Sequence, residues 1–199
     1  MKNYPKVEKL RDGTAVVLRP MAGGDQARVK DFYKGLPEQD RLFLRDDVSR
    51  DEVVDRWFAE LNYARVLPIL ALTDDEAEVI ACATLHRFPQ GWQRHVGEIR
   101  IVVAHDFQRR GLGSLMARVV VSEALEAGLD KLVAAMMTDQ MRTRRVFSQL
   151  GFIPEATLKD HVMDLRGRTH DLLIMTRNVK ALWEEMEQAD SAQTRPMEH

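Results

Sequence analysis

Apolar residues along this chain fall into short runs separated by polar turns, a pattern typical of a folded mixture of strands and helices. The predicted strands are Thr14–Arg19, Leu67–Thr73, Val79–Phe88, His95–Ala104, Lys131–Met137, Thr157–Leu165 and His170–Val179. The continuous apolar sequence IVVA at the end of the fourth strand predicts that this strand is covered on both faces.

Between these strands the apolar residues recur at helical spacing. The predicted helices span Gly23 to Gly35, a segment after Ser49 with Val53, Val54, Trp57, Phe58 and Leu61 on its apolar face, Gly111 to Ala127, and Gln140 to Leu150. Ser49 and Glu52 have the spacing of a capping box, and Gly128 and Gly151 are suited to end the last two helices. The order of elements predicts an α+β fold with a single mixed sheet and helices on both of its faces.

The chain has 199 residues, 45% of them hydrophobic, which is enough for a buried core. No repeat, low-complexity tract or linker interrupts the pattern. A single domain is therefore predicted over residues 1–183, followed by an acidic tail at 184–199 that frays.

The charge balance is nearly neutral, with 29 Lys and Arg against 31 Asp and Glu, a net of −2. This balance argues against non-specific nucleic-acid binding and against a polybasic membrane surface. No run approaches the roughly 18 apolar residues of a membrane span, and the N-terminal residues have no apolar segment like that of a signal peptide. The protein is therefore expected in the cytoplasm.

The single cysteine, Cys82, cannot form an internal disulfide and lies in the apolar run IACATL. A buried, unreactive thiol is the expected state, because nothing nearby in the sequence supplies the base and exposure that a reactive thiol needs. No group of Cys and His residues has the spacing of zinc ligands, so no metal site is predicted.

The segment Ile99–Met116 carries the most chemical information. A buried strand runs into a loop with the sequence QRRGLG, and a helix starts there. Glycines allow close approach of the backbone, and the free amides at a helix N-terminus attract anions. Arg109 and Arg110 add cationic donors. These features suit a pyrophosphate, although a tight strand-to-helix turn needs the same glycines.

The full pattern QRRGLGS resembles the Q/R-x-x-G-x-G/A signature of the GNAT superfamily of acetyl-CoA-dependent N-acetyltransferases. The two-helix segment after the first strand and the ending FSQLGF at Phe147–Phe152 are also similar to that family. The resemblance extends over nearly the whole chain. It implies a GNAT fold in which His95–Ala104 and Lys131–Met137 splay apart and acetyl-CoA lies in the gap.

The resemblance also implies the residues that bind the cofactor. Gln108, Arg109, Arg110, Gly111, Leu112, Gly113 and Ser114 match the pyrophosphate loop, which acts largely through backbone amides. Ile101, Val102 and Val103 match the part of the strand whose backbone pairs with the pantetheine arm.

An amine acceptor must lose a proton before it attacks a thioester, because an alkyl ammonium has a pKa of about 10.4. Glu98 is the candidate general base, since it lies on the strand that leads to the pyrophosphate loop, where glutamate bases of GNAT enzymes are found. Val96, Glu98, Arg100 and Val102 share one face of that strand. The alternative is that Glu98 forms an ion pair with Arg100 or His95. A strand amide near Val102 is expected to hold the tetrahedral oxyanion.

One position departs from the family pattern. Many GNAT members have a tyrosine on the last helix that protonates the leaving thiolate, and Phe147 occupies that position here. Phe147 cannot donate a proton, so water or another group must do so. The remaining polar candidates, each with a plainer structural role as the alternative, are His105, Asp106, His161, His170, Asp171, Arg142, Arg144 and Arg145.

The sequence therefore predicts an N-acetyltransferase that moves the acetyl group of acetyl-CoA to a primary amine in a ternary complex. The strand GEIRIVV and the segment RLFLRDD look similar to the acetyltransferase domain of bacterial protein-lysine acetylases. A protein lysine and a small amine or amino acid both remain open as acceptors, and Leu36–Asp47 is expected to line the acceptor cleft. A homodimer is possible. The alternative function is a non-catalytic acyl-CoA sensor.

Overall fold

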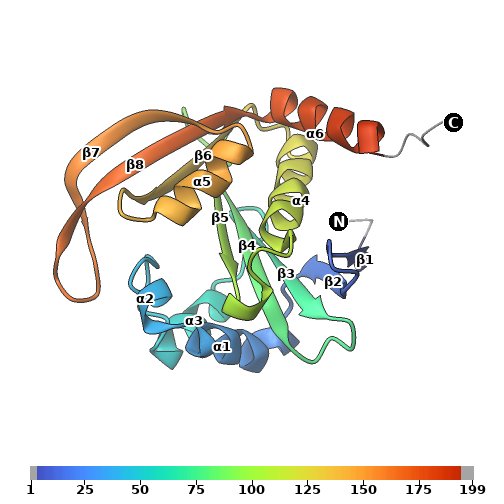
Figure 1. Cartoon of the computed structure of the whole chain (residues 1–199). Coiled ribbons are helices and arrows are strands. Elements are labelled where there is room, and N and C mark those ends of the chain that lie inside the picture. Colours follow the sequence, from blue (N-terminus) through green and yellow to red (C-terminus); the bar gives the residue numbers. More distant parts are fainter. Residues whose placement is uncertain (1–3, 194–199) are drawn as a thin grey trace, which may run out of the picture.

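Eight strands form one sheet in the order β1-β2-β3-β4-β5-β6-β8-β7 (Figure 1). The structure, a computed structural model, describes residues 4–193 and the side chains of residues 4–188. The strands are β1 (Lys6–Lys9), β2 (Ala15–Pro20), β3 (Val66–Thr73), β4 (Val79–Arg87), β5 (Val96–Val103), β6 (Lys131–Met137), β7 (Ile153–Met163) and β8 (Thr169–Asn178). Neighbouring strands are antiparallel except for β5 and β6, which are parallel. The prediction of an α+β fold with one mixed sheet is confirmed.

Helices cover both faces of the sheet, as predicted. They are α1 (Gln26–Gly35), α2 (Glu38–Arg41), α3 (Asp51–Ala59), α4 (Leu112–Glu126), α5 (Met141–Gln149) and α6 (Val179–Gln193), with short 3-10 turns η1 (Gly23–Asp25) and η2 (His105–Phe107). The apolar residues of α4 and α6 form one core with the sheet, and those of α1 and α3 form a second core on the opposite face. Because both faces are covered, β3 and β4 are buried along most of their length.

A buried carboxylate ties the start of α1 to β2. Asp25 is only 1% exposed and accepts hydrogen bonds from Arg19 at 2.7 and 2.9 Å and from Arg28 at 2.8 Å. The backbone N–H of Ala22 donates a further bond at 2.8 Å. Burial by itself would raise the pKa of Asp25, but the bonds from Arg19 and Ala22 outweigh it and hold that pKa below its usual value. Asp25 is therefore a paired, charged residue within the fold.

The parallel pair β5–β6 is joined along only part of its length. Its register connects Val96–Glu98 to Lys131–Val133 and ends there, although β5 continues to Val103 and β6 to Met137. Both strands stay paired with their outer neighbours beyond this point. The predicted splay is confirmed, and Ile101–Ala104 is consequently only half-buried beside the gap.

Several local predictions differ from the structure. Ser49 does not cap α3: the N-cap is Arg50, with no side-chain bond, and the Ser49 hydroxyl donates to Asp47 instead. No helix was predicted after Val179, whereas α6 runs to Gln193 with Leu182 buried in the core. Of the predicted acidic tail at 184–199, residues 194–199 lie outside the described residues, and its fraying stays a prediction. Where the domain itself ends stays a prediction. Strand β1 has no counterpart among the predicted elements, and β7 begins before its predicted start.

Candidate active site

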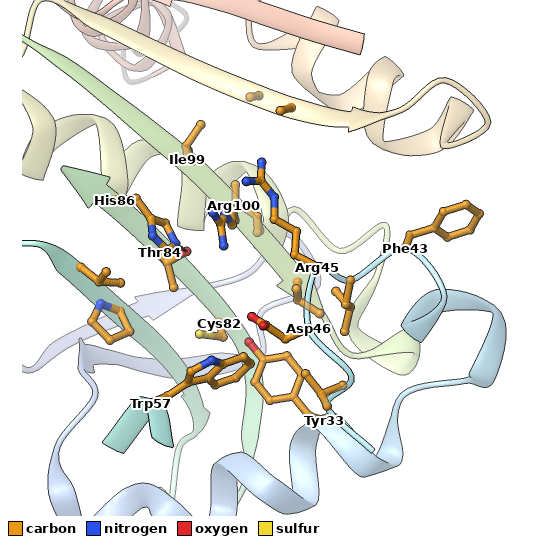
Figure 2. Close-up of a pocket in the computed structure, with 18 of the residues that line it drawn as sticks. Tyr33, Phe43, Arg45, Asp46, Trp57, Cys82, Thr84, His86, Ile99 and Arg100 are labelled. Atoms are coloured by element: carbon orange, nitrogen blue, oxygen red, sulfur yellow. Dashed lines mark hydrogen bonds between the residues drawn. The ribbon is translucent and has the colours of Figure 1, made fainter. Parts of the chain in front are cut away.

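A cavity of about 300 Å³ opens where β5 and β6 part (Figure 2). Residues of β5, β6 and α5 line it between the strands: Ile99, Ile101, Val102, Ala134, Met136, Gln140, Thr143 and Phe147. The cavity continues over the face of the sheet that α1 and α3 cover. There it is lined by Tyr33, Trp57, Cys82, Thr84, His86, Arg100 and, from the α2–α3 loop, Phe43, Leu44, Arg45 and Asp46. Part of the predicted segment Leu36–Asp47 thus lines this cavity.

The register of β4 and β5 decides which side chains face this part of the cavity. Glu98 lies opposite His86, and Arg100 lies opposite Thr84. Directly opposed residues of an antiparallel pair project from the same face of the sheet. Glu98 and Arg100, which were predicted to share a face of β5, therefore lie beside His86 and Thr84 of β4 on the face that α1 and α3 cover.

The same register assigns the backbone groups of β5. The Ala104 N–H donates to the Ile80 carbonyl at 2.9 Å, and the β4–β5 register is unbroken from there to Gly97. Alternation along the strand therefore directs the Val102 amide to β4 and the amides of Ile101 and Val103 to the edge that β6 leaves open. Val102 contributes its side chain to the cavity lining.

Two arginines converge on one oxygen of Glu98. Arg100 Nε donates to Glu98 Oε1 at 3.0 Å, and Arg45 Nη2 donates to the same oxygen. Arg45 and Arg100 line the cavity, whereas Glu98 is not among its lining residues and its side chain is 16% exposed. The ion pair with Arg100 that the sequence offered as the alternative is present. Arg45 lies within the segment expected to line the cleft, but its contact with Glu98 was not predicted.

His86 was not predicted as a site residue. Its Nε2 lies 3.0 Å from Thr84 Oγ1 on the same face of β4. Burial, followed by the nearby Arg100 guanidinium, lowers the pKa of His86 to about 4. The imidazole is therefore neutral near pH 7, and the positive charge of this part of the cavity comes from the arginines.

Tyr33 and Cys82 lie at the base of the cavity (Figure 2). The Tyr33 ring stands edge-on to Trp57, with ring centroids 5.3 Å apart. Burial raises the pKa of the Cys82 thiol to about 11 and raises that of Tyr33 well above its usual value. Both groups are neutral at physiological pH, and the predicted burial of Cys82 is confirmed.

Phe147 is buried and stands edge-on to Phe152, with ring centroids 5.0 Å apart. It lines the gap between the strands, where it offers no proton donor. Gln140 at the start of the same helix accepts a bond from the Met137 N–H through its side-chain oxygen at 2.9 Å. Thr143, one turn before Phe147, is the α5 hydroxyl that lines the cavity.

The segment Gln108–Ser114 follows β5 and leads into α4, outside the lining of the cavity. Gly111 is the N-cap, with a φ of +89°, and the first bond along the helix runs from the Leu115 N–H to its carbonyl at 3.0 Å. The amides of Leu112, Gly113 and Ser114 precede that bond, as at any helix N-terminus. The Leu112 side chain is buried, whereas Ser114 is exposed.

The two arginines of this segment differ. Arg110 pairs with Asp12 at 3.4 Å and lies over the Phe107 ring, 5.2 Å from its centroid. Arg109 is exposed, with a φ of +63° that few residues other than glycine adopt. The loop is therefore anchored to the β1–β2 turn through Arg110.

The other polar candidates lie away from the cavity. The imidazole of His170 lies between Asp139 at 2.8 Å and Asp164 at 2.9 Å. The hydrogen bonds to these two carboxylates raise the pKa of His170. The bond to His170 in turn lowers the pKa of Asp164 to about 2. His161 is exposed. The remaining exposed candidates are His105 and Asp106 of η2 and Arg142, Arg144 and Arg145 of α5. None of these residues lines the cavity.

Two further searches covered only residues 4–193. Within that range, no three His, Cys, Asp or Glu residues come together in a way that could hold a metal ion. Over the same residues, no helix has both the length and the apolar character needed to cross a membrane.

A family model described as the acetyltransferase (GNAT) family matches residues 30–152, which is more than half of the chain. The chain belongs to the GNAT family of acetyltransferases. This membership supports transfer of an acetyl group from acetyl-CoA, and the GNAT sequence signature at Gln108–Ser114 lies within the matched residues.

A curated relative, the acetyltransferase Pat of Mycolicibacterium smegmatis, is 26% identical over 149 residues. Those residues are 73% of this chain but only 43% of Pat, so the chain spans less than half of that relative's length. The solved GNAT domain of S. lividans PAT aligns with a TM-score of 0.75 and 18% identity, covering 89% of this chain and 98% of that one. The yncA protein of Salmonella typhimurium, solved with acetyl-CoA, aligns with a TM-score of 0.67 and 18% identity over 82% and 94% of the two chains. At these identities the solved structures establish the fold.

Proposed function

We propose that the protein is an N-acetyltransferase that moves the acetyl group of acetyl-CoA to a primary amine. The observation that carries the proposal is the open edge of β5, where the ladder with β6 ends at Glu98 and a cavity begins. An extended pantetheine arm can bond to the amide of Val103 on that edge, which leaves the amide of Ile101 for the carbonyl oxygen of the acetyl group. The acetyl group then lies in the cavity, and the acceptor approaches from the part under α1 and α3.

The donor's pyrophosphate is assigned to Gln108–Ser114. The left-handed turn at Gly111 aims the first amides of α4 away from the helix, and the helix dipole favours an anion there. Arg109 and Arg110 supply further positive charge. The yncA protein, which has the same fold and was solved with acetyl-CoA, supports acetyl-CoA as the donor.

In the proposed reaction the amine nitrogen attacks the thioester carbonyl carbon, a C–N bond forms, and the C–S bond breaks. Glu98 takes the ammonium proton, through a water because its carboxylate lies behind Arg45 and Arg100. The open-edge amide of Ile101 stabilises the oxyanion. The departing thiolate takes its proton from water or from the Thr143 hydroxyl, since Phe147 has none to give.

Replacing Gly113 by valine is expected to weaken CoA binding at least about tenfold, or about 1.4 kcal/mol. A Cβ at this position would meet only the Val103 side chain, at 3.9 Å, so the free protein can accommodate it. The side chain would instead obstruct the approach of the pyrophosphate to the loop. Calorimetric titration with CoA measures the effect, and Gly24→Val, at a glycine with open space around it, is the control. Equal affinities of wild type and Gly113→Val would contradict the loop assignment.

The function itself is tested by acetyl transfer to a panel of amines, with thiol release and product mass as readouts. The panel contains polyamines, amino acids, amino acid amides and lysine peptides. Saturable transfer to one class supports the enzyme. Binding of CoA without transfer to any acceptor supports the alternative, an acyl-CoA sensor. The cytoplasmic location, the absence of a metal and a homodimer stay predictions.

A further inference from the structure

We propose that the acceptor carries a carboxylate next to its amine and that Arg45 and Arg100 bind this carboxylate, which makes a small apolar α-amino acid the preferred substrate class. The inference rests on the proposed function and narrows it, because it selects one of the two acceptor classes that the sequence left open.

The first argument is the hydrogen-bonding capacity of the two arginines. A guanidinium has five N–H donors. Arg100 uses Nε on Glu98 and Arg45 uses Nη2 on the same oxygen, and among the described side chains and backbone neither guanidinium has another hydrogen-bond acceptor. Both side chains line the cavity. Two guanidinium groups held side by side by one carboxylate leave donors for a second carboxylate.

The second argument is the charge of this part of the cavity. Arg45 and Arg100 carry two positive charges against the one negative charge of Glu98, and His86 is neutral. Asp46, the next carboxylate in the lining, lies 3.7 Å from Arg56 and also acts electrostatically on Arg45. Glu60 also lines the cavity but is exposed to solvent. The positive charge is concentrated where Arg45 and Arg100 meet at Glu98, so an anionic group on the acceptor would be attracted to that place.

The third argument is the size of the cavity and the apolar part of its lining. The lining beyond the arginines is mixed, and its polar residues include Thr84 and His86. Tyr33, Trp57 and Leu44 form an apolar part of it that would contact an apolar substituent. A cavity of about 300 Å³ is at the small end of ligand pockets. A small amino acid with an apolar side chain fits all three features. A lysine side chain of a protein has no carboxylate near its amine.

The deciding experiment compares leucine with leucinamide, which differ only in the carboxylate. For the wild type, kcat/KM for leucine is expected to exceed that for leucinamide at least about thirtyfold, consistent with a charge-assisted bond. Arg45→Gln and Arg100→Gln are each expected to reduce this ratio below about fivefold, mainly by raising KM for leucine. Arg100→Lys is expected to recover only part of it, because lysine lacks the planar fork. Arg50→Gln, an exposed arginine near the same loop, is the matched control and should keep the wild-type ratio.

A second measurement separates this inference from the proposed function. Leucine binding is titrated by calorimetry in the presence of saturating CoA, with circular dichroism to confirm that each variant is folded. Transfer to lysine peptides or to leucinamide without a preference for leucine would leave the N-acetyltransferase standing and overturn the carboxylate site. Absence of transfer to every acceptor would reject the enzyme, and leucine binding that both arginine variants lose would still support the site. Absence of leucine binding to the wild type would overturn it.

Discussion

Replacing Glu98 by glutamine is expected to lower kcat about 10²–10⁴-fold, the usual contribution of a positioned proton acceptor. The amide keeps the size of the side chain but cannot take up the ammonium proton. Affinity for acetyl-CoA should not change, because the proposed cofactor contacts come from other residues, mainly through backbone amides. The measurement is kcat at saturating acetyl-CoA with a confirmed acceptor.

Because of the contacts of Glu98, it matters whether the substitution changes kcat or the acceptor KM. Because its carboxylate holds Arg45 and Arg100 together, a purely positioning role would raise the acceptor KM and leave kcat nearly intact. Glu60→Gln, at an exposed carboxylate in the same lining, is the control and should have little effect on kcat. A loss in kcat under about threefold, or ~0.65 kcal/mol, rejects Glu98 as the base. The proton would then leave through a water chain or through His86, since neither His161 nor His170 lines the cavity.

Replacing Asp25 by alanine is expected to lower the free energy of unfolding by about 3–5 kcal/mol, the typical cost of removing one partner of a buried ion pair. Asp25 is almost fully buried, and its loss leaves Arg19 with only the partly exposed Glu76 as a carboxylate partner. Urea unfolding at pH 7 measures the change. Asp55→Ala removes the partner of Lys30 and Gln26 at a site that is more accessible than Asp25, and it should cost no more than about 1 kcal/mol.

The difference in the free energy of unfolding between wild type and Asp25→Ala should depend on pH, because the pKa of Asp25 is lowered in the folded protein. A carboxylate whose pKa is lower in the folded state stabilises the protein above its unfolded pKa of about 3.9 and loses that contribution as the pH falls. The gap between wild type and Asp25→Ala should therefore narrow below about pH 4. A gap no larger than that of Asp55→Ala at pH 7 would show that Asp25 does not anchor α1.

The central part of the fold was predictable from local patterns. The apolar runs of the four middle strands, the helical spacing of α3 and the glycines that end or follow α1, α4 and α5 are local signals, and they located the elements that surround the cavity. Strand β1 was missed because three of its four residues are exposed, so its sequence has no apolar pattern typical of a strand. Its strand conformation follows from its pairing with β2. Helix α6 was not predicted, because its sequence is rich in glutamate and the burial of Leu182 depends on the rest of the fold.

In the candidate site, too, some residues were predictable from local sequence patterns and others were not. A period of two placed Glu98 and Arg100 together, and the loop glycines marked the start of α4. The position of His86 opposite Glu98 depends on the register between β4 and β5. The sequence would predict that position only if it fixed which residues form the turn between the two strands. Arg45 lies in a loop with no periodic pattern, and its contact with Glu98 spans 53 residues of sequence. Such a contact follows only from the three-dimensional packing of α2 and α3.

The partial joining of β5 to β6 has a consequence for the life of the protein in a cell. Because only three residue pairs connect the two strands, an acyl donor seated between them would act as a missing strand that holds the two halves of the sheet together. Ligand that binds only the folded state adds stability, about 2.7 kcal/mol at 100 times its Kd. The fraction of chains open to proteases would then fall as the donor becomes abundant. The abundance of the protein would thus follow the metabolic supply of its own substrate.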